Sequence, residues 1–275
     1  MNFTLKKINS KISKNQLIII EESRGTIIEN SIYELKGNGI NICDSDVLIK
    51  ENIIENSEFP SIAICEDSSA TLVNNKLRKS KHNGIAVRNA HHFELEGSEI
   101  EDVDLCGISI SDTKTCLIEQ NNISNCKIAA IEAYDGSMVN IFKNNIQFIK
   151  QYAFMVYTSA FTKVENNNIS DIEIAMVKLC YKGGGEFIKN QVCNCKNQKE
   201  GQTSFRYFFE ENGNFLSCTN ENSRKTDSIL LDDIIPENDI MCLKCGKKQR
   251  NCFLLNCGHR VYCGDCAKNE LENNH

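Results

Sequence analysis

Apolar and polar residues repeat along this chain with a period of 22 or 23 residues. The recurring pattern is an apolar residue, two variable positions, usually Asn, one variable position and a second apolar residue. Successive copies are 22 residues apart once and 23 residues apart six times. A register held this long indicates a repeat architecture. The eight copies begin at Ile27, Ile49, Leu72, Leu95, Ile118, Ile141, Val164 and Phe187.

A second series of apolar residues runs in phase with the first, and each member begins a short apolar-x-apolar alternation. An alternation with a period of two is typical of a strand with one buried face. Each unit is therefore predicted to hold three short strands separated by polar turns such as Asp44-Ser45. A helix is disfavoured because β-branched residues dominate and the apolar spacing is two. The series is Ile18, Ile40, Ile62, Ile85, Ile108, Ile131, Met155 and Val177.

Units of this length and strand content predict an all-β fold in which each coil stacks on the one before it. At a strand spacing of about 4.8 Å, eight coils would form a rod of roughly 40 Å. The repeated Asn side chains can bond from coil to coil, and Asn also tolerates the left-handed conformation expected at corners. Ser98 is the one departure in this series. The stretch from about residue 15 to 218 resembles the right-handed parallel β-helix repeat family.

The domain organisation follows from where this repeat fades. Residues 1–218 are predicted to form the β-helix of about eight coils with irregular end caps, the last of them the aromatic segment 205–218. Residues 219–240 are predicted to be a linker, because they begin with a polar run. Residues 241–275 hold six of the fifteen cysteines and are predicted to form a small zinc module.

The β-helix resemblance also implies an enzyme hypothesis, because many members of this family are polysaccharide lyases, hydrolases or epimerases. Their chemistry needs carboxylates or another base grouped on neighbouring coils. The third position after each residue of the second series instead holds side chains of mixed chemical type. An acidic stripe occurs at Asp44, Asp67, Asp112 and Asp135, where turn chemistry accounts for Asp equally well. The mixed positions are Cys43, Cys65, Arg88, Ser111, Tyr134, Thr158 and Cys180.

Two further features of the β-helix segment admit a bland and a sharper interpretation. His91-His92 falls at a predicted turn. The pair is either simply solvated there or has a metal-binding or catalytic role. Cys116 and Cys126 take positions where other coils have Val or Ile, which favours core filling by a small thiol. Cys193 and Cys195 form a closer pair without a second pair at ligand spacing, and core filling is expected there too.

Composition limits the surroundings and the partners of the chain. Its first twenty residues contain an apolar run of only four, too short for a secretory signal or a membrane helix. We therefore expect a cytoplasmic protein without membrane attachment, whose cysteines are reduced thiols or metal ligands. The net charge of −6 argues against nucleic acid as a general partner.

The cysteine-rich tail carries the clearest chemistry. Cys242 and Cys245 form one CxxC pair and Cys263 and Cys266 form another, with Cys257-Gly-His259 between them. Two such pairs are typical of a tetrahedral zinc site, since the sulfurs of one turn can face one ion. We predict Zn²⁺ as cofactor. The predicted ligands are Cys242, Cys245, Cys257, His259, Cys263 and Cys266.

This spacing resembles the first six ligands of a C3HC4 RING finger, of the C-terminal type found in inhibitor-of-apoptosis ubiquitin ligases. "LNCGHRVYCGDCA" at 255–267 matches that type almost position by position. The resemblance implies a first ion held by the two CxxC pairs. It implies a second ion held by Cys257, His259 and two further ligands, so that site is incomplete in these residues.

Three explanations of the incomplete second site stay open. In the first the gene product continues to the last ligand pair, in the second Cys252 and His275 substitute as ligands, and in the third a single zinc ion binds.

The resemblance implies a RING-type E3 ubiquitin ligase, whose partners are an E2 ubiquitin-conjugating enzyme and a protein substrate recognised by the β-helix. RING ligases position the E2–ubiquitin conjugate and carry no nucleophile, so no catalytic residue is predicted. Two alternatives remain at this point: a carbohydrate-active or carbohydrate-binding β-helix, and an interaction scaffold without catalytic role.

Overall fold

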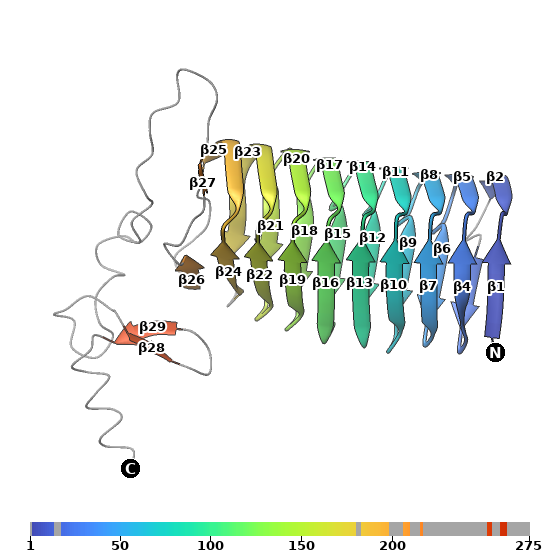
Figure 1. Cartoon of the computed structure of the whole chain (residues 1–275), viewed down its shortest axis with the longest axis horizontal. Helices are drawn as coiled ribbons and strands as arrows, with labels where there is room; N and C mark the ends of the chain where they lie inside the picture. Colours follow the sequence, from blue (N-terminus) through green and yellow to red (C-terminus); the bar gives the residue numbers. More distant parts are fainter. Residues whose placement is uncertain are drawn as a thin grey trace, which may run out of the picture.

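The computed structural model describes residues 2–13, 18–179, 183–197, 206–209, 215–216, 252–254 and 259–262. Within residues 2–197 the chain winds as an all-β parallel solenoid of about eight coils, which stack along one axis from the N-terminus onward (Figure 1). The predicted fold class is confirmed. No helix in the described residues has the length and apolar content needed to cross a membrane.

The first strand of every coil belongs to one ten-stranded parallel sheet, in which each strand pairs with the strand one coil away. Alternate residues of these strands point into the solenoid and out to solvent, as the apolar alternation predicts. The ten strands are β1 (Asn2–Lys6), β4 (Arg24–Ile28), β7 (Asp46–Lys50), β10 (Ser69–Val73), β13 (His92–Glu96), β16 (Thr115–Glu119), β19 (Met138–Phe142), β22 (Phe161–Glu165), β24 (Gly184–Ile188) and β26 (Arg206–Phe209).

The second strand of each coil stacks in the same way. β26 and β27 continue the stacking inside the aromatic segment 205–218. The second strands are β2 (Asn9–Ser13), β5 (Ser31–Leu35), β8 (Ile53–Ser57), β11 (Lys76–Ser80), β14 (Glu99–Val103), β17 (Asn122–Cys126), β20 (Asn145–Ile149), β23 (Asn168–Leu179), β25 (Gln191–Asn197) and β27 (Phe215–Leu216).

The third strand of each coil forms the remaining face of the solenoid. The long strand β23 takes part in both the second and the third column, because it pairs with β20 through one half and with β21 through the other. The third strands are β3 (Ile18–Glu21), β6 (Ile40–Cys43), β9 (Ile62–Cys65), β12 (Ile85–Arg88), β15 (Ile108–Ser111), β18 (Ala129–Tyr134) and β21 (Tyr152–Val156).

The predicted register of the third column is wrong in one coil. Phe154, and not Met155, stacks on Ile131, and Val177 stacks on Phe154 in turn. Tyr157 therefore takes the outward place next to Tyr134 that was predicted for Thr158. Four consecutive apolar residues in β21, Ala153 to Val156, leave the alternation undefined in this strand, so stacking on the neighbouring coil decides which of them face the core.

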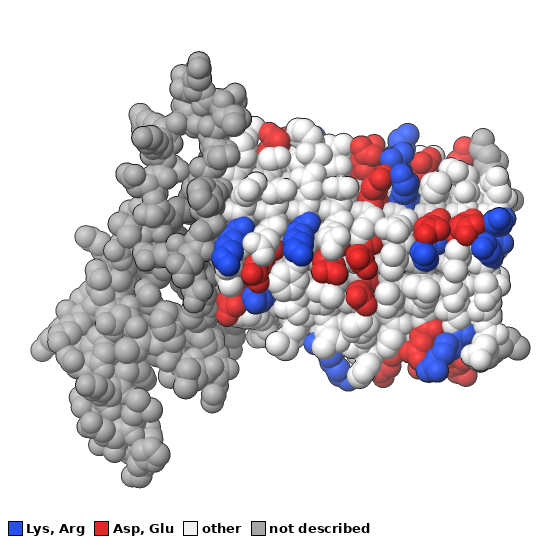
Figure 2. Space-filling view, viewed as in Figure 1, with Lys and Arg blue, Asp and Glu red and all other residues white. Residues whose placement is uncertain are grey.

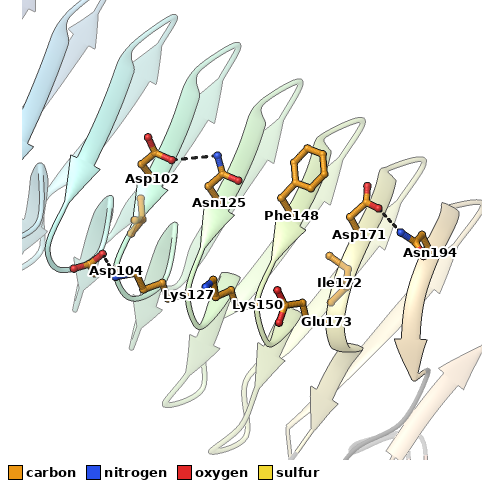
Figure 3. A pocket seen from close by; sticks show the side chains of 11 residues that line it. Asp102, Asp104, Asn125, Lys127, Phe148, Lys150, Asp171, Ile172, Glu173 and Asn194 are labelled. Carbon is orange, nitrogen blue, oxygen red and sulfur yellow. Dashed lines mark hydrogen bonds and ion pairs between the residues drawn. The ribbon is translucent and has the colours of Figure 1, made fainter.

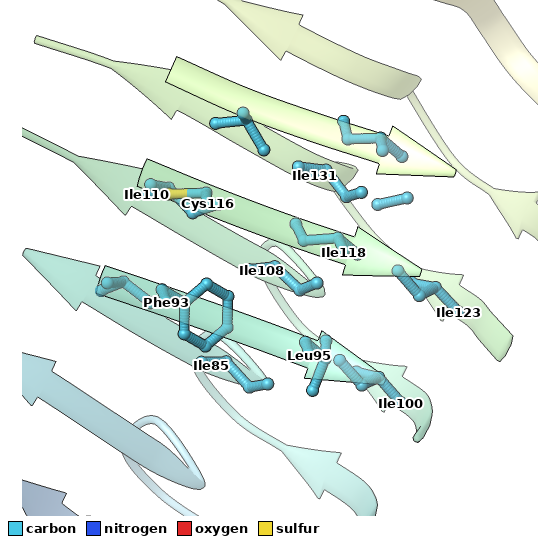
Figure 4. Close-up of a cluster of buried hydrophobic side chains, with 14 of the residues drawn as sticks. Ile85, Phe93, Leu95, Ile100, Ile108, Ile110, Cys116, Ile118, Ile123 and Ile131 are labelled. Carbon is cyan, nitrogen blue, oxygen red and sulfur yellow. The ribbon is translucent and has the colours of Figure 1, made fainter. Parts of the chain in front are cut away.

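The core is a continuous column of aliphatic side chains inside the coils (Figure 4). Ile118 is fully buried between Leu95 and Ile141, its register partners one coil to either side. Each such side chain contributes about 2–3 kcal/mol by leaving water. Cys116 lies in this core, as predicted for a small thiol that replaces an aliphatic residue.

The repeated Asn residues form a buried ladder along the corner between the first and second strands of each coil. Asn121 donates from Nδ2 to Oδ1 of Asn144 at 3.0 Å, and Asn144 donates to Asn167 at 2.9 Å. The backbone N–H of Asn121 also donates to Asn144 Oδ1. Ser98 keeps the backbone part of the ladder, since its N–H donates to Asn121 Oδ1, but it has no amide to donate.

The expectation that the Asn residues themselves adopt the left-handed conformation is wrong for this ladder. The left-handed residue is the one just before each ladder position, for example Glu51 (φ 56°), Gln120 (φ 57°) and Lys143 (φ 52°). The Asn residues stay out of the left-handed region because their side chains must point inward to bond with the next coil.

Candidate functional site

Most of the predicted zinc ligands lie outside the described residues. These are Cys242, Cys245, Cys257, Cys263 and Cys266; of His259 the backbone is described, at the start of β29. The assignment of six ligands therefore stays a prediction.

The described backbone of this segment is a short antiparallel pair. β28 (Cys252–Leu254) pairs with β29 (His259–Tyr262), with Leu254 opposite His259. An extended chain rises about 3.3 Å per residue, so β29 carries the backbone roughly 10 Å from His259 to Tyr262. The RING resemblance assigns His259 and Cys263 to different ions, and this assignment stays a prediction. The donor set of thiolates and one imidazole suits zinc.

Two cysteines of the solenoid correct an expectation from composition. The structure joins Cys43 and Cys65 as a disulfide between β6 and β9, which are neighbours in the third column, with Cα atoms 4.9 Å apart. The expectation that the cysteines are reduced thiols or metal ligands is therefore wrong for this pair. The two residues face each other because the 22-residue step places them at one register position.

The remaining cysteines of the solenoid follow the prediction of core filling in most cases. Burial raises the pKa of the Cys116 and Cys126 thiols to about 12, and it raises the pKa of Cys106 further. These thiols stay protonated at neutral pH and are poor nucleophiles. Cys195 packs against the core, whereas Cys193 lies on the outer side of β25. Cys180 lies outside the described residues.

The acidic corners adopt a turn conformation, and His92 contacts side chains near it. Asp44, Asp67, Asp112 and Asp135 all have positive φ, between 45° and 52°, so the turn interpretation is confirmed. His92 lies 3.2 Å from Thr115 Oγ1 and 3.7 Å from a Glu94 carboxylate oxygen. In the described part of the chain no three His, Cys, Asp or Glu side chains come together to hold a metal ion.

A groove of about 530 Å³ follows the corner between the second and third strands of successive coils. We call it the corner groove. One of its ridges is a row of five residues at one register position, and Figure 3 shows them side by side along the coils. The row is Asp102, Asn125, Phe148, Asp171 and Asn194.

The opposite ridge of the corner groove is charged, and its floor is apolar. The ridge consists of Asp104, Lys127, Lys150 and Glu173, and the floor includes the buried Val103 and Ile172 (Figure 3). A further hollow of about 530 Å³ continues along the same corner toward the N-terminus and shares Asp102 and Asp104 with the corner groove.

Contacts inside the corner groove divide its first ridge into two pairs around Phe148. Asn125 donates to Asp102 at 3.1 Å, and Asn194 donates to Asp171 at 2.5 Å. On the other ridge Lys127 pairs with Asp104 at 2.7 Å. Phe148 lies between the two side-chain pairs and is 52% exposed.

The corner groove is a poor match to the paired carboxylates of a glycoside-cleaving site. Its acidic residues form two groups on coils three steps apart, about 14 Å at strand spacing. Carboxylates of different groups are therefore too far apart to act as acid and base partners, which are separated by about 5–10 Å. At one end Asn125 and Lys127 donate to Asp102 and Asp104. Both carboxylates are therefore already engaged by side chains of the next coil.

A polar network on the third face was missed by sequence reasoning. Ser109 donates to one carboxylate oxygen of Glu132 at 2.7 Å, and the Tyr157 hydroxyl donates to the other. Tyr134 stacks on Tyr157 with ring centroids 5.4 Å apart. Burial, and then the hydrogen bond to Glu132, raise the pKa of Tyr157 well above its usual range. Tyr157 is therefore a hydrogen-bond donor that ties two coils together.

Comparison with known families gives a result for each part of the chain. The family model described as right handed beta helix region matches residues 16–169, more than half of the chain. The chain belongs to this family. In this β-helix protein, a second model, the C3HC4-type RING zinc finger, matches residues 238–275.

No curated protein matches this β-helix chain. Among solved structures it is similar to QnrB1, a plasmid-mediated fluoroquinolone resistance protein, at 12% identity and a TM-score of 0.22, over 71% of this chain and 84% of that one. It is also similar to HetL, a pentapeptide repeat protein involved in heterocyst differentiation regulation from the cyanobacterium Nostoc, at 10% identity and a TM-score of 0.21, over 68% and 81%. TM-scores this low give no argument about function.

Proposed function

We propose that this protein is a RING-type ubiquitin ligase whose β-helix holds a protein substrate while its RING segment binds an E2 enzyme. The observation that carries the proposal is the RING family match at residues 238–275 on a chain that also forms a long solenoid. Zinc and E2 binding are what that family implies, and a repeat scaffold is suited to contact with proteins.

In this proposal the chain contributes position and no nucleophile. The RING segment would hold the E2–ubiquitin thioester in a reactive pose, and the solenoid would hold the substrate lysine within reach. The lysine amine then attacks the thioester carbonyl, an isopeptide bond forms, and the thiol of the E2 leaves. The rate acceleration in such a reaction comes from the orientation of the reacting groups and from translational and rotational entropy that was already lost on binding.

Zinc would have a structural part in the RING segment. Cys242, Cys245, Cys263 and Cys266 would hold one ion, and Cys257 and His259 would contribute to another. A small zinc module obtains much of its folding free energy from its metal, so loss of ligands would remove the surface that binds the E2.

The test measures zinc content and ubiquitin transfer on the same samples of the full chain. A panel of E2 enzymes is charged with ubiquitin, and discharge of each conjugate to free lysine is followed with and without the protein. We expect faster discharge of at least one conjugate. Replacing Cys263→Ser is expected to remove about one zinc ion per chain and to return discharge to the rate of the E2 alone.

A matched control uses the same substitution on the solenoid. Cys193 is half-buried on β25 and is not one of the predicted ligands, so Cys193→Ser should leave zinc content and discharge unchanged. If the zinc-loaded protein accelerates no conjugate in the panel, the ligase proposal is wrong.

A further inference from the structure

Phe148 has a conformation that its side chain does not favour. It has a left-handed backbone, with φ of 57°, at a register position that Asp102, Asn125, Asp171 and Asn194 share with φ between 51° and 58°. Short polar side chains adopt this conformation most readily, because they bond to nearby groups. Phe148 has no such bond to offer and remains 52% exposed, so the fold gains little from an aromatic ring here.

A ligand would account for the ring. An exposed aromatic side chain on a rigid ridge contributes most to binding free energy when a partner covers it. Its large apolar surface is held by only two side-chain torsions, so little conformational freedom is lost on binding. The neighbouring side-chain pairs Asp102–Asn125 and Asp171–Asn194 hold the two flanks of Phe148 in place.

The charges around Phe148 select the chemistry of the ligand. The lining of the corner groove has four carboxylates and two ammonium groups, and one ammonium group, that of Lys127, is already paired with Asp104. In the described residues Asp171 accepts from a neutral amide, and Glu173 makes no ion pair. The lining of the corner groove therefore keeps a net negative charge, with Phe148 and Lys150 between its two acidic pairs.

The coil spacing turns this arrangement into a sequence pattern. Asp102 lies two coils from Phe148, about 10 Å, and Asp171 lies one coil away on the other side, about 5 Å. An extended chain covers these distances in about three and about two residues. A peptide along the corner groove would thus place a basic residue, an apolar residue three positions on, and a second basic residue two positions further, in one chain direction or the other.

We infer that the corner groove binds an extended peptide segment of a protein substrate with this basic–x–x–apolar–x–basic pattern. The inference rests on the proposed function, since it names the class of segment that the ligase would recognise. The apolar side chain packs on Phe148, the basic side chains approach Asp102 and Asp171, and the Lys150 ammonium donates to a peptide carbonyl. Recognition combines a central aromatic contact with charge-assisted hydrogen bonds at its ends.

The test is a titration of the full chain with fluorescein-labelled GSKGSFGKGS and with its reverse-direction version GSKGFSGKGS, followed by fluorescence anisotropy. We expect one of the two peptides to bind at least tenfold more tightly than GSEGSFGEGS and GSKGSSGKGS, which lack the basic and the apolar residues. Raising salt should weaken binding.

Variants of the protein locate the peptide. Phe148→Asn introduces the residue that the register position favours, so the fold should melt no earlier than the wild type while binding weakens at least fivefold. Asp171→Asn combined with Glu173→Gln should weaken binding at least fivefold and reduce its salt dependence.

Matched controls test exposed groups on another corner. Met138 is 58% exposed, and Asp112 and Asp135 are left-handed like Asp171. Met138→Asn, and Asp112→Asn with Asp135→Asn, should leave binding within twofold of the wild type. Equal binding of the lysine and glutamate peptides, or wild-type affinity in Phe148→Asn, would overturn the inference.

The titration contains neither E2 nor ubiquitin, so it separates this inference from the proposed function. Peptide binding that Phe148→Asn abolishes supports the corner groove even if no E2 conjugate is discharged. Active discharge without selective peptide binding removes the corner groove as the substrate site and leaves the ligase proposal intact.

Discussion

At the residue scale, the buried Asn ladder is the feature on which the solenoid most depends. Asn144 is 1% exposed, and its Nδ2 donates both to the Ile118 carbonyl and to Asn167 Oδ1. Its Oδ1 accepts from the N–H and the side chain of Asn121. One side chain therefore satisfies two backbone groups of the preceding coil that water cannot reach and also bonds to the Asn of the next coil.

Removal of one rung should destabilise the protein strongly. Asn144→Ala leaves buried donors and acceptors without partners, and we expect the free energy of unfolding to fall by about 3 kcal/mol. Asn140→Ala is the control, because Asn140 is exposed on β19 and should change stability by less than about 0.5 kcal/mol. Denaturant midpoints measure both. Equal midpoints for the two variants would show that the ladder contributes nothing.

At Ser98 a substitution can add a ladder hydrogen bond instead of removing one. Other rungs donate to the carbonyl 25 or 26 residues earlier, as Asn121 does to Leu95, and Ser98 has no amide for the corresponding Leu72 carbonyl. Ser98→Asn supplies that donor, so the same denaturant series should place its midpoint above that of the wild type, by about 1 kcal/mol of stability.

At the element scale, neighbouring coils are joined through strands of the same column. β6 and β9 pair in register from Ile40–Ile62 to Cys43–Cys65, and the disulfide adds a covalent link at the end of this pairing. The remaining strand pairs on this face depend on backbone hydrogen bonds and on side-chain networks such as Ser109–Glu132–Tyr157.

The covalent link should make stability depend on reduction. The disulfide closes a loop with a sequence separation of 22, and a loop of this size stabilises a fold by about 3 kcal/mol through the unfolded state. A thiol reductant should lower the denaturant midpoint of the wild type. It should leave that of Cys43→Ser unchanged, with Cys193→Ser as the control that responds like the wild type. A wild-type midpoint that ignores the reductant would contradict the link.

At the scale of the whole molecule, charge is distributed so that ridges carry ion pairs and parts of the faces are neutral. Arg78 pairs with Glu99 and Glu101 across coils, and Lys6 pairs with Glu29. Figure 2 shows such charged clusters on one face, while the area over β17 and β20 is uncharged. Since each coil contacts mainly its neighbours, the stack behaves as a series of similar units.

A stack of similar units should tolerate the loss of one complete unit. Deleting residues 76–98 removes one 23-residue period and brings Asn75 and Asn121 into consecutive rungs. We expect a folded solenoid that is shorter by about 4.8 Å, seen as a retained β-sheet circular dichroism spectrum and a smaller maximum dimension in X-ray scattering. Deleting residues 76–87, half a period, should unfold the stack. Equal behaviour of the two deletions would contradict the model of independent coils.

Much of this architecture was predictable from the chain because coil contacts repeat at a fixed sequence distance. Ile27, Ile49 and Leu72 mark the core row, Asn30 and Asn52 mark the ladder, and both recur with the period of the fold. The row of Asp102, Asn125, Phe148, Asp171 and Asn194 has the same period, and the aromatic residue among polar ones was a signal in the sequence. The zinc ligands remain a prediction from spacing alone.

The order of apolar and polar residues therefore determined the solenoid, its period, its core rows and its Asn column, because these are set by contacts one period apart. Only the tertiary structure decided that Phe154 and not Met155 faces the core, since both are apolar and the neighbouring coil selects between them. It also decided which corner residues are left-handed and that Cys43 meets Cys65. The corner groove belongs to this second group, because a hollow between two ridges exists only once coils are stacked in register.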